Sequence, residues 1–176
     1  YLTILLLLIA TLVWWANKMI RPLRHWGAIY VPSKDKVLDI MIEFAQLQPG
    51  EKAVDLGSGD GRVLIALAKT GAEAHGFEIE RKLVKRSKEN ITEAQMEDLA
   101  FTHQQSFWKA DLSEYDVIFV YGMRHVMKRL EKKLEKELKP GARVISNAFE
   151  FPEWIESKKQ GHVYLYEYSR TKNQKS

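Results

Sequence analysis

The sequence predicts an α/β fold of the Rossmann-like type, with a mainly parallel sheet and one N-terminal transmembrane helix. Short apolar segments typical of buried strands alternate with amphipathic segments along most of the 176 residues. A glycine-rich turn over residues 57–61 directly follows the first of these strands. An almost unbroken apolar run over residues 2–16 precedes the alternating part. Such alternation places parallel strands in the middle and helices on both faces.

The N-terminal apolar run extends more weakly to Ile20, which makes it long enough to cross a bilayer. Roughly 19 residues give about 28 Å of helix, close to the ~30 Å hydrocarbon core. Trp14 and Trp15 stand near its C-terminal end, where amphipathic rings favour the membrane interface. The run therefore predicts a membrane anchor.

Basic residues set the expected orientation of this anchor. Lys18, Arg21 and Arg24 follow the apolar run, which by the positive-inside rule places the rest of the chain on the cytoplasmic or mitochondrial matrix side. A cleaved signal peptide is the alternative, but residues 14–17 offer no clean small-residue cleavage pattern.

Composition narrows the chemistry of the remaining chain. Its length allows one domain with a substantial core, and 45% hydrophobic and 28% charged residues are ordinary for a globular protein. The absence of cysteine excludes disulfides, thiolate metal sites and cysteine nucleophiles. The net charge of +4 suits an anionic membrane surface or a nucleic acid and does not decide between them. The five histidines are scattered, without metal-ligand spacing and without an obvious general base.

The expected elements follow in order along the chain. Ser33 can cap a first helix, whose apolar residues recur at helical spacing until residues 48–50 stop it. We expect strands over residues 52–56, 73–79, 100–105, 116–121 and 143–149, and helices over residues 62–69, 81–95 and 124–138. Residues 162–169 alternate and predict a late, antiparallel edge strand.

The clearest helix carries a run of lysines and glutamates. Over residues 124–138 its apolar side chains form one stripe, composed of Val126, Leu130, Leu134 and Leu138. The charged residues predict a solvated face rather than a binding site. Because its lysines are interleaved with glutamates, they do not predict a nucleic-acid partner.

The glycine-rich turn distinguishes between two kinds of nucleotide cofactor. A dinucleotide fingerprint needs a third glycine where this chain has Arg62. Asp55 and Asp60, before and within the turn, would repel a bound pyrophosphate. S-adenosyl-L-methionine has no phosphate and carries an ammonium and a sulfonium, which these carboxylates would stabilise. The turn therefore predicts a site for this cationic methyl donor.

Glu78 is a further residue of the predicted cofactor site. It ends the second strand about 20 residues beyond the first glycine, where an acidic side chain can accept both ribose hydroxyls. An exposed charge at a strand end is the alternative interpretation. A phosphate-binding P-loop is excluded because no Gly-Lys-Ser/Thr sequence follows the glycines.

Several further stretches resemble a known family. They are Tyr30-Val31-Pro32-Ser33, residues 54–63, residues 130–135, Gly141-Ala142-Arg143-Val144-Ile145 and residues 149–154 with Phe149, Phe151, Pro152 and Trp154. The chain is similar to the seven-β-strand protein lysine methyltransferases that include the ATP synthase c-subunit and adenine nucleotide translocase enzymes and small archaeal relatives. The resemblance covers about residues 30–168 and implies a class I methyltransferase with a seven-stranded sheet.

The resemblance also implies a division of the chain and a set of contacts with S-adenosyl-L-methionine, whose product is S-adenosyl-L-homocysteine. We expect a transmembrane anchor (1–20), a linker and cofactor-lid segment (21–33), the methyltransferase domain (34–170) and a polar tail (171–176). Expected cofactor contacts are Tyr30, Ser33, Asp55, Gly57, Ser58, Gly59, Asp60, Gly61, Glu78, Ser106 and Phe107. The family usually has Asp or Asn at the position of Ser106, so the adenine contact is the weakest of these.

A lysine acceptor must lose a proton before it is methylated, because its unperturbed pKa is about 10.4. A desolvated channel with aromatic walls favours the neutral amine and can hold an alkyl-ammonium by cation–π contact. Candidate walls are Tyr30, Tyr121, Phe149 and Trp154, and Tyr121 closes the fourth strand, where the acceptor should enter. No metal site is expected.

Three functions are compatible with these residues. The first is a membrane-anchored protein-lysine methyltransferase, whose tether would raise the local concentration of a membrane-protein lysine. The second is a small-molecule, lipid or RNA methyltransferase on the same fold. The third is a non-catalytic membrane module that only binds the cofactor.

Overall fold

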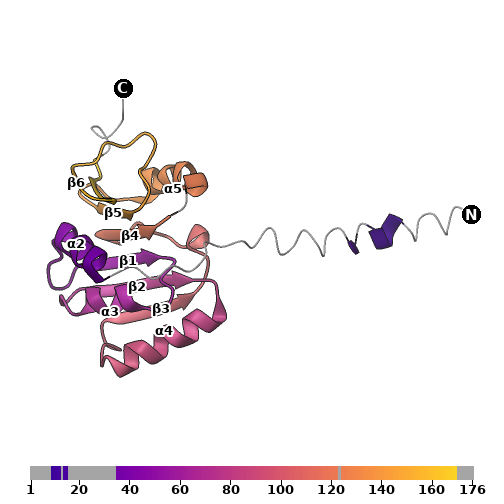
Figure 1. Ribbon diagram of the computed structural model, residues 1–176, viewed down its shortest axis with the longest axis horizontal. Helices are drawn as coiled ribbons and strands as arrows, with labels where there is room; N and C mark the ends of the chain where they lie inside the picture. The colour runs from indigo at the N-terminus through magenta and orange to yellow at the C-terminus, as the bar shows by residue number, and fades with distance from the viewer. Residues whose placement is uncertain (1–8, 13, 16–34, 123, 170–176) are drawn as a thin grey trace, which may run out of the picture.

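The strands form one seven-stranded sheet in the order β3-β2-β1-β4-β5-β7-β6. The computed structural model describes residues 9–12, 14–15, 35–122 and 124–169. Its strands are β1 (Lys52–Leu56), β2 (Glu73–Glu78), β3 (Ala100–Gln104), β4 (Val117–Tyr121), β5 (Arg143–Asn147), β6 (Lys158–Gln160) and β7 (Val163–Glu167). Its helices are α2 (Asp35–Ala45), α3 (Arg62–Ala68), α4 (Arg81–Glu93), η1 (Phe107–Lys109) and α5 (Arg124–Glu137). Figure 1 shows the central strands stacked from β5 to β3.

The sheet is parallel from β3 through β5, whereas β7 runs antiparallel to both β5 and β6. The strand order reverses between β1 and β4, because the chain first builds outward to β3 and then crosses back. In open α/β sheets a ligand binds at this reversal, beyond the carboxyl ends of the strands. The glycine-rich turn lies at this place.

Two apolar cores cover the two faces of the sheet. On one face α2, α3 and α4 pack through side chains such as Phe44, Leu64 and Ile91. On the other face α5 packs through Leu130 and Leu134. Both cores include alternate residues of the same strands, since successive strand side chains point to opposite faces. The predicted Rossmann-like architecture is confirmed.

The end of the sheet differs from the prediction at one strand. The late strand β7 is antiparallel as expected, but it is not at the edge, because β6 pairs with its outer side. All three residues of β6, Lys158–Gln160, are exposed. A strand without apolar side chains gives no periodic signal in the sequence, so it was not predicted.

The predicted transmembrane helix (1–20) falls largely on residues 1–8, 13 and 16–20, which lie outside the described part. Within the described residues no helix has the length and apolar character needed to cross a membrane.

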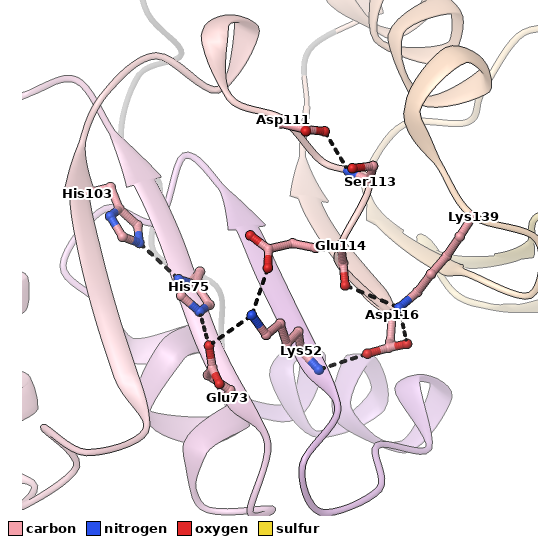
Figure 2. Close-up of polar contacts among 9 residues, drawn as sticks. All are labelled: Lys52, Glu73, His75, His103, Asp111, Ser113, Glu114, Asp116 and Lys139. Atoms are coloured by element: carbon pink, nitrogen blue, oxygen red, sulfur yellow. Dashed lines mark hydrogen bonds and ion pairs between the residues drawn. The ribbon is translucent and has the colours of Figure 1, made fainter.

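A polar network joins the loops at the amino ends of the strands (Figure 2). Lys52 binds Glu114 and Asp116 at 2.7 and 2.9 Å, through its ammonium and its backbone N–H respectively. Glu73 binds His75, which in turn contacts a ring nitrogen of His103 at 2.9 Å. His75 lies within β2, and His103 lies one residue before the end of β3, where it pairs with Phe77.

Candidate functional site

The turn between β1 and α3 depends on three glycines with left-handed backbone. Gly57, Gly59 and Gly61 have φ angles of 96°, 53° and 83°, a region that side chains with a Cβ rarely adopt. The backbone N–H groups of Gly57 and Ser58 donate to the carbonyl of Phe77 at 2.9 and 3.2 Å. The turn is thereby fixed against β2, next to Glu78.

Gly76, which sequence reasoning missed, lets this turn lie close to the sheet. A Cβ at Gly76 would lie 2.5 Å from Cβ of Ser58 and 2.7 Å from Cδ1 of Leu64. The hydroxyl of Ser58 is buried and has no hydrogen-bond partner among the described residues. A glycine inside a strand often marks such a close backbone approach, and this was the available signal.

Glu78 organises the site through backbone donors. Its Oε1 accepts from the N–H groups of Ile79 and Glu80 at 2.7 and 2.8 Å, and its Oε2 accepts from Gly59 at 3.1 Å. A carboxylate has about four acceptor positions, so roughly one remains for a ligand. Glu78 can therefore accept one ribose hydroxyl directly, and accepting a second would compete with Gly59.

Asp55 is the electrostatically unusual group of the site. Burial first, and the neighbouring charge of Glu78 second, raise the pKa of its carboxyl to about 7. Within the described residues, the charge acting on Asp55 is thus one of the same sign. A cationic ligand would supply the opposite charge, so the residues present fit S-adenosyl-L-methionine and disfavour an anionic pyrophosphate.

Asp60 differs from Asp55 in having its own counter-charge. Its carboxylate binds Nε and Nη2 of Arg62 at 3.1 and 2.9 Å, and the side-chain amide of Asn90 donates to its carbonyl at 2.8 Å. Asp60 therefore helps to hold the turn and the start of α3. The attraction for a cation rests mainly on Asp55 and Glu78.

The end of β3 brings the predicted adenine region to the site. The N–H of Gln105 donates to the carbonyl of Glu78 at 3.1 Å, which holds the chain after β3 against the end of β2. Ser106 precedes η1 and is partly exposed, and no hydrogen bond of its side chain caps η1. Phe107 packs partly against the core. Both residues are in the expected region, and their contact with adenine stays a prediction.

Tyr121 lies at the carboxyl end of β4, with 37% of its surface exposed. Its register partner on β5 is Asn147, which is largely buried. Because strand side chains alternate, Asp55, Tyr121 and Asn147 point to the same face of three adjacent strands. We therefore add Asn147 to the candidate acceptor side. Its strand-end position was visible in the sequence, but the pairing with Tyr121 was not.

The other predicted channel walls occupy different places. Trp154 is buried in the core on the α5 face, where its indole N–H donates to Glu135 at 3.3 Å. Phe149 packs partly against the same core. Tyr30 and Ser33 lie outside the described residues. Of the predicted walls within the described residues, Tyr121 is the one that the structure brings to the exposed strand end.

A structural comparison agrees with this fold and with an S-adenosyl-L-methionine cofactor. An RNA methyltransferase from Salinibacter ruber, solved in complex with S-adenosyl-L-homocysteine, matches with a TM-score of 0.75 and 34% identity. The match covers 78% of this chain and 93% of that chain. Fold and site together define an S-adenosyl-L-methionine-dependent methyltransferase with a Rossmann-like fold.

Sequence comparisons narrow the class to a family. Residues 55–158 match the model of the ANTKMT methyltransferase domain. An ATP synthase c-subunit lysine N-methyltransferase of Rattus norvegicus is 34% identical over 149 residues, which are 82% of this chain and 68% of that protein. A protein-lysine N-methyltransferase of Saccharolobus islandicus is 36% identical over 147 residues, with 78% and 91% covered. The chain belongs to the ANTKMT methyltransferase family.

The relatives differ in how much of their length is matched. The chain spans 58% of the Mus musculus ATP synthase c-subunit lysine N-methyltransferase, against 91% of the archaeal protein.

Proposed function

We propose that this methyltransferase acts on the side-chain amine of a lysine in a membrane-embedded protein, and that residues 1–20 hold it at the membrane. The observation that supports S-adenosyl-L-methionine as the cofactor is Asp55, a buried carboxyl beside the like charge of Glu78. A cationic methyl donor would neutralise the charge of these carboxyl groups. The rat and archaeal relatives, whose names specify lysine, support the choice of acceptor.

When bound, S-adenosyl-L-methionine supplies a methyl group on a sulfonium for in-line displacement. The protein's part is then to position the acceptor and to exclude water. Tyr121 offers an aromatic wall for an alkyl-ammonium, and the amide oxygen of Asn147 can accept a hydrogen bond from a neutral lysine amine. Burial of the acceptor beside Asn147 would favour the neutral amine, because burial disfavours the charged form.

The N-terminal residues support the membrane part of the proposal. Residues 9–12 and 14–15 are helical. Ile9, Leu12, Trp14 and Trp15 are all exposed, with 74% of Leu12 accessible. Apolar side chains exposed in this number favour an apolar environment, and a bilayer provides one. A tether of this kind would raise the concentration of the enzyme near lysines that emerge from the membrane.

Labelled cofactor incubated with membranes tests the proposal. We expect the label in lysine of membrane proteins, identified by mass spectrometry, and its loss when Asp55→Ala removes the buried carboxyl. Asp111→Ala is the matched control, since Asp111 lies in the loop at the amino ends of the strands, where it accepts from the N–H of Ser113 at 3.0 Å. Label in RNA, lipid or a small molecule, and never in lysine, would overturn the lysine assignment.

A further inference from the structure

The outward face of α5 carries basic residues. In the sequence these residues are part of a run in which lysines and glutamates are mixed. Its exposed cations are Arg124, Lys128, Arg129, Lys132 and Lys136. Four of them recur at every fourth residue, which places them along one side of the helix. We define these four, Arg124, Lys128, Lys132 and Lys136, as the basic stripe. Its twelve-residue span covers about 18 Å.

The carboxylates of the α5 glutamates bind partners outside this stripe. Glu131 is buried and accepts from the backbone N–H groups of Glu153 and Trp154. Glu135 accepts from the indole of Trp154, and Glu137 pairs with Lys133 at 2.6 Å. The three acids therefore make their hydrogen bonds and ion pairs with other groups, although Glu135 follows Lys132 by three residues and lies on the same side of the helix. Within the described part of the chain, no ion pair joins any member of the basic stripe to an acid.

The surroundings of the stripe add one cation–π pair and one apolar side chain. The guanidinium of Arg129 lies 4.2 Å from the ring centre of Trp108 and covers that ring. Ile155 follows Trp154, which contacts α5, and half of its surface is exposed. In the loop that contacts α5, Glu150 pairs with Lys159, while Glu153 is exposed. The net charge on this side of the molecule is therefore positive.

From this arrangement we propose that the basic stripe docks on the surface of a membrane that contains anionic phospholipids. A row of one guanidinium and three ammonium groups fits charged headgroups, and an exposed isoleucine in the loop that contacts α5 fits an apolar layer beneath them. Among the described residues of α5 the exposed aromatic ring is that of His125, and Arg129 covers the Trp108 ring that lies against the helix, so α5 offers few of the stacking rings that bind single-stranded RNA. The proposal rests on the pattern of charges on α5. It does not depend on whether the methyl acceptor is a lysine.

Docking along α5 would also orient the site. The helix begins at Arg124, directly after the strand end that carries Tyr121. The stripe thus starts at the acceptor edge and runs back along the α5 face of the sheet. A membrane lying on the stripe would bring the carboxyl end of β4 near the headgroups, while the Tyr121 side chain points to the opposite face of the sheet.

Lysine labelling of the full chain tests the proposal. Vesicles of phosphatidylcholine alone are compared with vesicles that contain phosphatidylglycerol, and labelled lysines are quantified by mass spectrometry. We expect the anionic vesicles to protect Lys128, Lys132 and Lys136, and to leave the α4 residues Lys82, Lys85 and Lys88 unprotected. Because protection is compared between two vesicle types, anchoring by the N-terminal segment does not produce the effect.

Charge variants give the quantitative test by co-sedimentation. The triple variant Lys128→Gln, Lys132→Gln, Lys136→Gln should lose the preference for anionic vesicles by on the order of 100-fold, at about fivefold per charge. The variant Lys82→Gln, Lys85→Gln, Lys88→Gln removes the same charge from the opposite layer and should keep the preference. Equal losses in both variants, or protection of the stripe by an RNA oligomer and not by vesicles, would overturn the proposal. Cofactor binding, measured separately by calorimetry, distinguishes this failure from failure of the proposed function.

Discussion

The carboxyl group of Asp55 makes cofactor binding dependent on pH. Its pKa of about 7 is far above the ordinary value of 3.8. The free enzyme therefore holds a proton on Asp55 between roughly pH 4 and 7 that the unfolded chain has released, so this group lowers stability as pH rises through that interval. A cationic ligand prefers the ionised form. Binding and stability thus respond to the same proton in opposite directions.

We expect the affinity for S-adenosyl-L-methionine to fall as pH decreases from 8 to 6, by up to about tenfold per unit below 7. In Asp55→Asn this dependence should be largely lost, and affinity at pH 8 should fall by about 1–3 kcal/mol. Isothermal titration calorimetry across this range checks both. Comparing the two proteins cancels the titration of the cofactor's own amine. Identical slopes would mean that Asp55 does not face the ligand.

At the level of single residues, the sequence predicted the charged groups of the candidate site better than it predicted their hydrogen-bond and ion-pair partners. Residue types and strand ends were enough to place Asp55 and Glu78 at the site. That Asp60 pairs with Arg62 could not be predicted, because either side chain could instead have pointed to solvent. Three acceptor positions of Glu78 are occupied by backbone N–H groups, which depends on the turn geometry and not on residue type.

Glu131 joins α5 to the chain that follows β5. One carboxylate oxygen accepts from the N–H groups of Glu153 and Trp154, at 2.9 Å each. Burial raises the pKa of this carboxyl, although the two hydrogen bonds act in the opposite direction. The hydroxyl of Tyr166 accepts from the N–H of Phe151 in the same loop. These contacts explain why an acid occupies the buried side of an otherwise amphipathic helix.

Glu131→Ala should lower the free energy of unfolding by about 2–4 kcal/mol, since it leaves two N–H groups in the protein without an acceptor. Glu131→Gln keeps an acceptor oxygen and should lose much less. Urea denaturation measures both, with the exposed neighbour Lys132→Ala as a control expected within about 0.5 kcal/mol of the native chain. If the alanine variant were as stable as this control, the two hydrogen bonds would contribute nothing to holding the loop.

At the level of elements, apolar periodicity was sufficient to predict the strands and helices that bury side chains. β1 matches its expected bounds, and α3, α4 and α5 begin at the expected residues. Charge was harder to interpret, because the sequence of α5 does not show which of its glutamates bind other parts of the fold and which of its lysines stay exposed. β6 is held by pairing with β7 and has no apolar pattern of its own, so only the tertiary structure reveals it.

The whole molecule combines a cofactor site at the strand ends with a separate apolar N-terminal segment. Removing residues 1–20 should leave cofactor affinity unchanged, because Asp55, Glu78 and the glycine turn are held within the sheet and its helices. Methylation of a membrane-embedded acceptor should fall, since the local concentration gained from the tether is lost. Calorimetry and methyl transfer to membranes, performed on the same preparation, check both outcomes. Undiminished transfer to membranes would argue against a role for the tether.

The short outer strand β6 also affects how this protein behaves at high concentration. An open sheet edge can recruit a strand from another molecule and so begin aggregation. Here the edge offers three residues, and the ammonium groups of Lys158 and Lys159 are already paired with Glu43 and Glu150. An incoming strand would gain a ladder of a few bonds while stripping water from two charges. The shortness and the charge of β6 therefore disfavour fibril-like growth at this side of the sheet.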